Sequence, residues 1–187
     1  MQKSIPQKEQ FIIKEFLMLT INAGLATRNQ YYPIYKKEKD NESAMHFKTD
    51  VNNYLIEYLY QFNNCNENEH YDKIENMSKI LSEKHKNILH NERFRIGVSQ
   101  KLINLFLKYY WTIDKIKTPF HCPFDNGIKL ELNNNGLQDW TKLDSLDEYK
   151  KYVYLAKTHA DKKNISIAEW ELSLWNNIAQ KRLGLEL

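Results

Sequence analysis

The residues best suited to chemistry fall between His90 and Ile128. Gly97 stands just before a long apolar stretch, where it can supply an unusual backbone angle, and Lys101 is predicted in the first turn of the helix that follows. Free amides at a helix N-terminus bind phosphate, and the positive end of the helix dipole lowers the pKa of a nearby lysine. This favours the neutral amine, the form that nucleophilic catalysis needs. Asp125 follows one long helix and one loop later, far enough for the chain to fold back toward Lys101.

This arrangement resembles the helix-hairpin-helix DNA glycosylases, especially the 8-oxoguanine-glycosylase-like branch. In that superfamily a glycine-containing hairpin precedes a helix that bears the catalytic lysine, and a Pro-x-Asp motif follows it. The Gly-Val-Ser-Gln-Lys run at 97–101 looks like the hairpin and lysine, and Pro-Phe-Asp at 123–125 looks like the later motif. The resemblance covers roughly residues 77–132. It implies that Lys101 attacks the sugar C1′, while Asp125 assists its activation and steadies the oxocarbenium-like charge.

The resemblance also implies a partner, duplex DNA with one nucleotide turned out of the stack. Basic and hairpin residues are expected to hold the DNA, and they are Arg93, Arg95, Gly97, Ser99 and Gln100. A base-flipping enzyme needs an aromatic or apolar pocket, and the candidates near the motif are Trp111, Phe120, His121 and Phe124. The activity implied is excision of a damaged or modified base, with strand cleavage as a further option.

Simpler interpretations stand beside these. Lys101 could be a solvated helix lysine, and Asp125 could cap a helix that begins at Asn126, a role compatible with catalysis. The tryptophans, Trp111 among them, are more often core residues than pocket residues. A non-catalytic helical module that binds nucleic acid or another protein is therefore the alternative function. A helical nuclease with an Arg-x4–6-His pair does not fit, because no arginine has a histidine at that spacing.

Apolar residues at helical spacing predict the elements that position the candidate site. The expected helices are Glu9–Ala26, with Gly24 as its stop, His46–Phe62, Asp72–Leu89, Ser99–Ile113, Leu143–His159 and Ile167–Arg182. Ser145 with Glu148, and Ser166 with Glu169, have the spacing of capping boxes. Two prolines keep Thr118–Asp125 non-helical, and Asn63–Tyr71 is expected to be a polar loop. We therefore expect an all-α fold of six to eight helices, with the Ser99–Ile113 helix central.

Composition limits the function classes. The 187 residues suit a single helical domain over 1–187, which could form two lobes around a cleft, with the hairpin-helix-loop site at 93–128. The net charge of +3 permits an anionic partner without demanding one. No run approaches the roughly 20 apolar residues of a membrane span, and the first ten residues are polar, so a cytoplasmic protein without a membrane partner is expected. The oligomeric state stays open.

Cysteine and histidine usage bears on cofactors. Cys65 and Cys122 are expected to be free thiols, with Cys65 in a surface loop. The sequence has no CxxC or HxxxH pair, whereas zinc needs three or four converging nitrogen or sulfur ligands. Neither a metal nor another cofactor is expected.

Overall fold

The computed structural model describes residues 5–26, 32–133 and 136–184. Within these ranges the chain is all-α and without strands, as predicted. The elements are α1 (Gln7–Leu25), α2 (Asn41–Phe62), α3 (Glu67–His85), the short 3-10 helix η1 (His90–Glu92), α4 (Ile96–Trp111), α5 (Asn126–Glu131), α6 (Leu146–Asp161) and α7 (Ile167–Leu183). Residues 112–125, between α4 and α5, form an irregular connection, and the two prolines in it are incompatible with a regular helix there.

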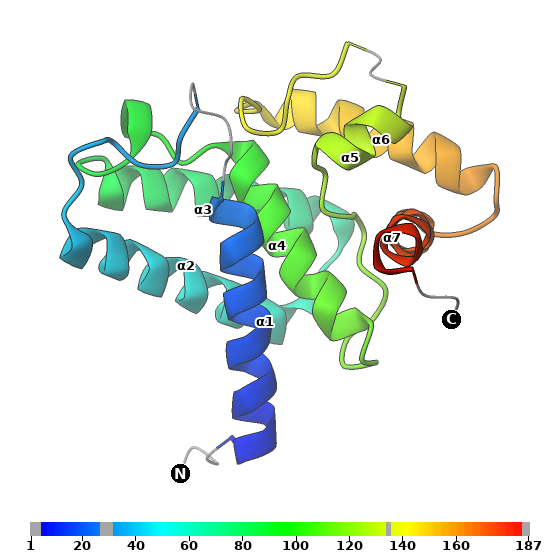
Figure 1. Ribbon diagram of the computed structural model, residues 1–187, viewed down its shortest axis with the longest axis horizontal. Helices are drawn as coiled ribbons and strands as arrows, with labels where there is room; N and C mark the ends of the chain where they lie inside the picture. The colour runs from blue at the N-terminus through cyan, green and yellow to red at the C-terminus, as the bar shows by residue number, and fades with distance from the viewer. Residues whose placement is uncertain (1–4, 27–31, 134–135, 185–187) are drawn as a thin grey trace.

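Helix α4 is the centre of the fold, as its apolar sequence predicts. Twelve of its sixteen residues are buried, and it packs against α1, α2, α3 and α6. Figure 1 shows α2 and α3 on one side of α4, and α5, α6 and α7 on the other. A helix covered on most of its surface holds its side chains in fixed positions. Residues of α4 are therefore well suited to carry a rigid site.

The start of α3 differs from the predicted loop at Asn63–Tyr71. Asn66 caps α3 by accepting a hydrogen bond from Glu69 N, and Glu69 accepts one from Asn66 N, so the helix already begins at Glu67. This reciprocal capping box satisfies two amides that would otherwise lack partners. Cys65, just before it, is buried rather than exposed, with Sγ 3.4 Å from Tyr58 Oη. Both cysteines are free thiols, as predicted.

The two predicted caps of the C-terminal helices are present. Ser166 and Glu169 form a complete capping box at α7, and Ser145 accepts a hydrogen bond from Glu148 N at α6. Helix α2, by contrast, begins five residues before the expected His46, because the Asp40 side chain caps it at Ser43 N. Polar caps therefore decide where these helices start.

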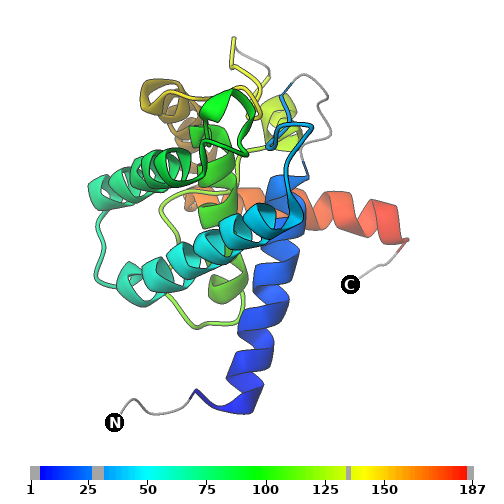
Figure 2. The same ribbon diagram turned by 90° about the vertical axis from the view of Figure 1, so that its left-hand side faces the viewer.

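Gly24 lies inside α1 and does not stop it. A Cβ atom at this position would lie 2.3 Å from Leu102 Cδ2, so the glycine allows α1 and α4 to approach closely. Figure 2 shows the N-terminal part of α1 projecting beyond the other helices. In the described part of the chain, no helix combines the length and apolar character that crossing a membrane requires.

Candidate functional site

Lys101 and Asp125 face each other, with Nζ and Oδ2 3.5 Å apart. The Lys101 side chain is 12% exposed and that of Asp125 is 41% exposed. Asp125 is also the N-cap of α5, since its Oδ1 accepts hydrogen bonds from Gly127 N at 2.9 Å and Ile128 N at 3.3 Å. One carboxylate oxygen therefore caps a helix while the other is turned to the lysine. The capping role foreseen for Asp125 and its pairing with Lys101 coexist.

The environment of Lys101 lowers the pKa of its ammonium group, although two of its contacts favour the charged form. Burial lowers the pKa of its ammonium group, and the negative charge of Asp125 opposes this shift without cancelling it. The Trp140 ring covers the ammonium, with its centroid 4.2 Å from Nζ. Because α4 begins at Ile96, Lys101 lies in the second turn rather than the first, beyond the reach of the helix dipole. The cause of the lowered pKa is thus burial, and the predicted dipole mechanism is wrong.

Gly97 brings Trp140 to this position. Its backbone is not left-handed, contrary to the predicted unusual angle. Instead, a Cβ atom there would lie 1.8 Å from the carbonyl oxygen of Trp140, and the Gly97 amide donates to Leu143 O at 2.8 Å. The glycine is needed because the main chain of 140–143 rests directly on the start of α4.

The amides at the start of α4 are already bonded to protein atoms. Ile96 N donates to Asp144 Oδ1 at 3.2 Å, and Gly97 N donates to Leu143 O. Val98 N and Ser99 N both donate to Arg95 O at 3.1 Å, so the expectation that the amides opening this helix are free for phosphate is wrong in this structure. The segment before α6 supplies the acceptors, which motif spacing alone does not reveal.

The two arginines before α4 are both engaged in the fold. The Arg93 side chain is 33% exposed, and its Nε donates to Asp144 Oδ2 at 2.8 Å. Arg95 is buried, and its guanidinium donates to the carbonyl oxygens of Tyr32 and Pro33 at 2.9 and 3.1 Å. Burial keeps Arg95 away from a DNA backbone, whereas Arg93 has surface to offer.

Ser99 and Gln100 are fully buried, so their side chains cannot make the predicted contacts with nucleic acid. Ser99 Oγ donates to Arg95 O within the helix at 3.2 Å. The Gln100 amide pairs with the main chain of Phe124. Both residues therefore serve the interior of the fold.

The predicted base-pocket residues do not form a common pocket. Phe124 is fully buried, and His121 is buried and hydrogen bonded. Phe120 is half-buried and packs edge-on against Phe62, while Trp111 is half-buried in the last turn of α4. The aromatic ring beside Lys101 is instead Trp140, which no motif in the sequence connects with the lysine. Of the two tryptophans of α7, Trp170 is a core residue, whereas Trp175 is largely exposed.

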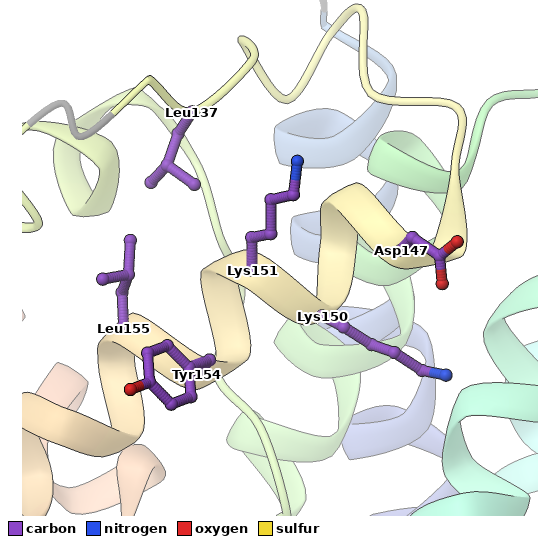
Figure 3. Close-up of a pocket in the computed structure, with 6 residues that line it drawn as sticks. All are labelled: Leu137, Asp147, Lys150, Lys151, Tyr154 and Leu155. Atoms are coloured by element: carbon purple, nitrogen blue, oxygen red, sulfur yellow. The ribbon is translucent and has the colours of Figure 1, made fainter.

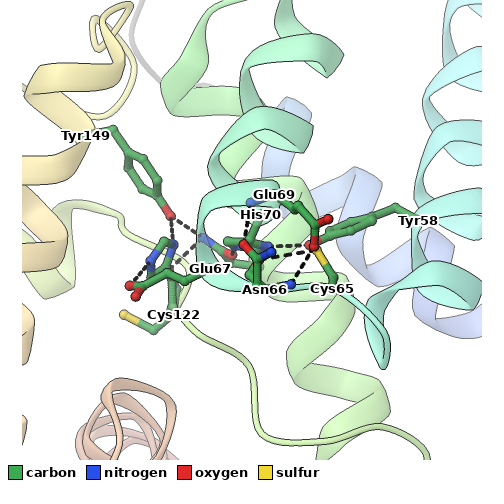
Figure 4. Close-up of polar contacts among 10 residues, drawn as sticks. Tyr58, Cys65, Asn66, Glu67, Glu69, His70, Cys122 and Tyr149 are labelled. Carbon is green, nitrogen blue, oxygen red and sulfur yellow. Dashed lines mark hydrogen bonds and ion pairs between the residues drawn. The ribbon is translucent and has the colours of Figure 1, made fainter.

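A buried chain of hydrogen bonds joins α3, α4, the 112–125 connection and α6 (Figure 4). Asn104 is its centre, with Oδ1 2.9 Å from His70 Nε2 and Nδ2 donating to Tyr149 Oη at 3.0 Å. Tyr149 Oη is 2.8 Å from His121 Nδ1, and His121 Nε2 is 3.1 Å from Glu67 Oε1. Burial lowers the pKa of both histidines, so they are neutral at pH 7. Sequence reasoning missed this network, because it joins four separate segments.

Other surface features lie away from the pair. The hollow of Figure 3 is on α6 and the preceding segment, where Leu137 and Leu155 line it beside Lys150, Lys151 and Tyr154. It includes neither Lys101 nor Asp125. Among the described residues, no group of three or more His, Cys, Asp or Glu is arranged to hold a metal ion.

The chain was also compared with known proteins. No protein-family model, curated sequence or solved structure matches it significantly.

Proposed function

We propose that this chain is a DNA glycosylase and lyase that excises a damaged or modified base, with Lys101 as nucleophile and Asp125 as its assistant. The observation that carries the proposal is the pairing of a buried lysine, its pKa lowered by burial, with a carboxylate 3.5 Å away. Nucleophilic lysines are activated by such desolvation. Carboxylate oxygen Oδ2, unlike Oδ1, is not used for capping α5 and is turned to the amine.

The reaction would proceed at the sugar of an extruded nucleotide. The neutral Lys101 nitrogen forms a bond to C1′ while the glycosidic C1′–N bond breaks, and the departing base keeps the electron pair and takes up a proton. Asp125 accepts a proton from the amine and stabilises positive charge at C1′. Opening of the sugar ring gives an imine between Lys101 and C1′, which permits β-elimination of the 3′ phosphate. Arg93 is the arginine that we expect to contact the DNA backbone.

Borohydride trapping tests this proposal, because it reduces the imine to a stable amine that joins protein and DNA. Duplexes carrying 8-oxoguanine, uracil or an abasic site would be incubated with the unchanged protein, with Lys101→Gln and with Lys129→Gln. Lys129 is a matched control, a lysine of the neighbouring helix α5 that is paired with Asp139 at 2.7 Å. We expect a covalent adduct that is lost in Lys101→Gln and kept in Lys129→Gln.

Release of free base is measured on the same duplexes, so that an enzyme without lyase activity is also detected. Absence of adduct, base release and DNA binding on all of them would overturn the proposal. DNA binding that survives Lys101→Gln without any base release would instead favour a non-catalytic nucleic-acid-binding module.

A further inference from the structure

A side chain of α4 holds the main chain next to Asp125. Gln100 is fully buried, and its amide makes two hydrogen bonds to Phe124 besides one to Gly97 O at 2.9 Å within its own helix. Nε2 donates to Phe124 O at 2.7 Å, and Oε1 accepts from Phe124 N at 3.1 Å. This pairing fixes the orientation of a peptide segment as well as its distance from the helix. Because Gln100 adjoins Lys101 and Phe124 adjoins Asp125, it joins the immediate neighbours of both residues of the site.

A second amide, one turn along α4, holds the same segment. Asn104 Nδ2 donates to Cys122 O at 3.0 Å and lies 3.3 Å from Gln100 Oε1. Cys122 and Phe124 are both almost fully buried, although the segment has no regular secondary structure. Two amides on one helix face thus fasten two alternate residues of the connection that leads into Asp125.

The Asn104 amide is itself held by the buried network of Figure 4, and the Gln100 amide is joined to that network only through Asn104. The acceptor Oδ1 of Asn104 requires His70 to carry its proton on Nε2, which leaves His70 Nδ1 to accept from Tyr58 Oη at 2.7 Å. Tyr149 Oη holds the other end of the Asn104 amide. Satisfied buried networks are rigid, because any rotation leaves a polar atom without a partner.

We propose that Gln100 is a positioning residue that sets the distance between Lys101 and Asp125 through the main chain of Phe124. Its meaning for catalysis rests on the proposed function, whereas its effect on the lysine–aspartate pair does not. Asp125 Oδ1 is tied to α5, so a displacement of residue 124 carries the carboxylate away from the lysine. Removing the Gln100 amide therefore weakens the pair without touching either of its members.

The test follows the titration of Lys101 by NMR in the absence of DNA. Lysine is labelled with carbon-13 at Cε, and the Lys101 signal is assigned by its loss in Lys101→Arg. Gln100→Met preserves bulk but lacks the amide, and it is compared with Asp125→Asn and with the double variant. Asp125 raises the pKa of Lys101, so both single variants are expected to shift the titration to lower pH. In the Asp125→Asn background, Gln100→Met should cause no further shift.

Tyr54→Phe is the control for a purely structural loss, since it removes a hydrogen bond to Lys73 O at 2.7 Å between α2 and α3. It should lower stability and leave the Lys101 titration unchanged. The proposal is overturned if Gln100→Met, like Tyr54→Phe, lowers stability without changing the Lys101 titration. It is also overturned if Gln100→Met shifts that titration equally with and without the Asp125 carboxylate. Should Gln100→Met fail to fold, Gln100→Asn, which keeps the amide but shortens its reach, replaces it under the same criteria.

An activity measurement separates this inference from the proposed function. On any duplex that the unchanged protein cleaves, Gln100→Met should lower kcat by about tenfold or more, with KM changed by less than about twofold. A shifted titration in a protein that is inactive on all duplexes would retain Gln100 as a positioning residue and refute the glycosylase. If the unchanged protein is active but Gln100→Met alters neither the Lys101 titration nor kcat, the glycosylase would be retained and Gln100 would be refuted as a positioning residue.

Discussion

Lys101 and Lys108 lie seven residues apart on α4, and each is paired with a carboxylate, but the two pairs are built differently. Lys108 Nζ is 2.6 and 2.9 Å from the two carboxylate oxygens of Glu171, and the side chains are 11% and 5% exposed. Lys101 is as buried as Lys108, whereas Asp125 is 41% exposed and 3.5 Å away. The Glu171 carboxylate uses both oxygens on the lysine, while that of Asp125 uses one to cap α5.

Under the proposed function, this difference separates a structural contact from the pair that would react. The Lys108–Glu171 pair ties α4 to α7 and has no oxygen to spare for a ligand. The Lys101–Asp125 pair is looser and reaches solvent on the aspartate side, so a substrate could take the place of one partner. The same residue types on the same helix thus acquire different roles from their exposure and their other bonds.

The largest expected effect comes from removing the Glu171 charge. Glu171→Gln leaves the Lys108 ammonium buried without a counter-charge, and we expect a loss of about 3–5 kcal/mol in the free energy of unfolding. Urea denaturation followed by circular dichroism measures it. A loss below about 1 kcal/mol would show that Lys108 reaches water, and the two pairs would then differ less than their burial suggests.

Lowering the pH tests the two buried histidines that are joined through Asn104, which lies on α4 between the two lysines. Burial lowers the pKa of His70 and His121 below 6.5, so in the folded chain they stay neutral while in the unfolded chain they bind protons. The stability they contribute is therefore complete above about pH 7.5 and falls as the pH drops through 6.5, by up to about 1.4 kcal/mol per pH unit for each histidine.

Denaturation curves at pH 7.5, 6.5 and 5.5 measure this loss. Glu171 acts in the opposite direction, because burial raises its pKa, so the comparison uses the difference between the unchanged protein and His70→Gln. The variant should show a shallower dependence on pH. Equal slopes in the two proteins would mean that His70 becomes protonated without leaving the fold.

Gly97→Ala tests the packing that covers Lys101 but not Lys108. The added Cβ would meet the Trp140 carbonyl oxygen at 1.8 Å, a main-chain atom that cannot rotate away. We expect a loss of about 1–3 kcal/mol in unfolding free energy and a changed titration of Lys101. Ser99→Ala, at the same buried end of α4, is the control, because it removes only the hydrogen bond to Arg95 O. An unchanged Lys101 titration in Gly97→Ala would mean that Trp140 does not control that amine.

The smallest effect on stability is expected from Asp125→Asn. Asparagine caps helices about as well as aspartate, and the carboxylate of Asp125 is 41% exposed and 3.5 Å from a lysine as buried as Lys108, so the loss should be about 1 kcal/mol, well below that of Glu171→Gln. Thermal or urea unfolding beside Glu171→Gln gives the comparison directly. If Asp125→Asn and Glu171→Gln lower the free energy of unfolding equally, the two lysine–carboxylate pairs do not differ in the way that their exposure suggests.

Some of this arrangement can be predicted from the sequence. The apolar run of α4 identifies the central helix, and the prolines of 118–125 identify the connection that lets Asp125 return to Lys101. The resemblance carried by two short motifs, in order along the chain, predicts the pairing of Lys101 with Asp125. Each of these features is a short stretch of sequence, or depends only on one connection that leads the chain back toward α4.

The remaining features depend on contacts between distant segments. The sequence alone predicts a turn glycine at Gly97, whereas the structure shows that the Trp140 carbonyl packs against it. Likewise, Gln100 has the sequence context of an ordinary helix residue, and only the structure shows that it is hydrogen bonded to Phe124. Glu67 lies in a polar run whose helical character depends on a cap, rather than on apolar periodicity. Hydrophobic spacing cannot show which polar side chains are buried, since that depends on what covers them.

The central place of Asn104 in the hydrogen-bond network has a consequence for how the molecule opens. Residues 122–124 look like a surface connection, yet their main chain is bonded to side chains of the most buried helix. Local fluctuations that expose ordinary loops to deuterium exchange would have to disrupt α4 as well. The Phe124 amide should therefore exchange as slowly as the amides of the α4 core, and this irregular segment should unfold in the same cooperative unit as the helix.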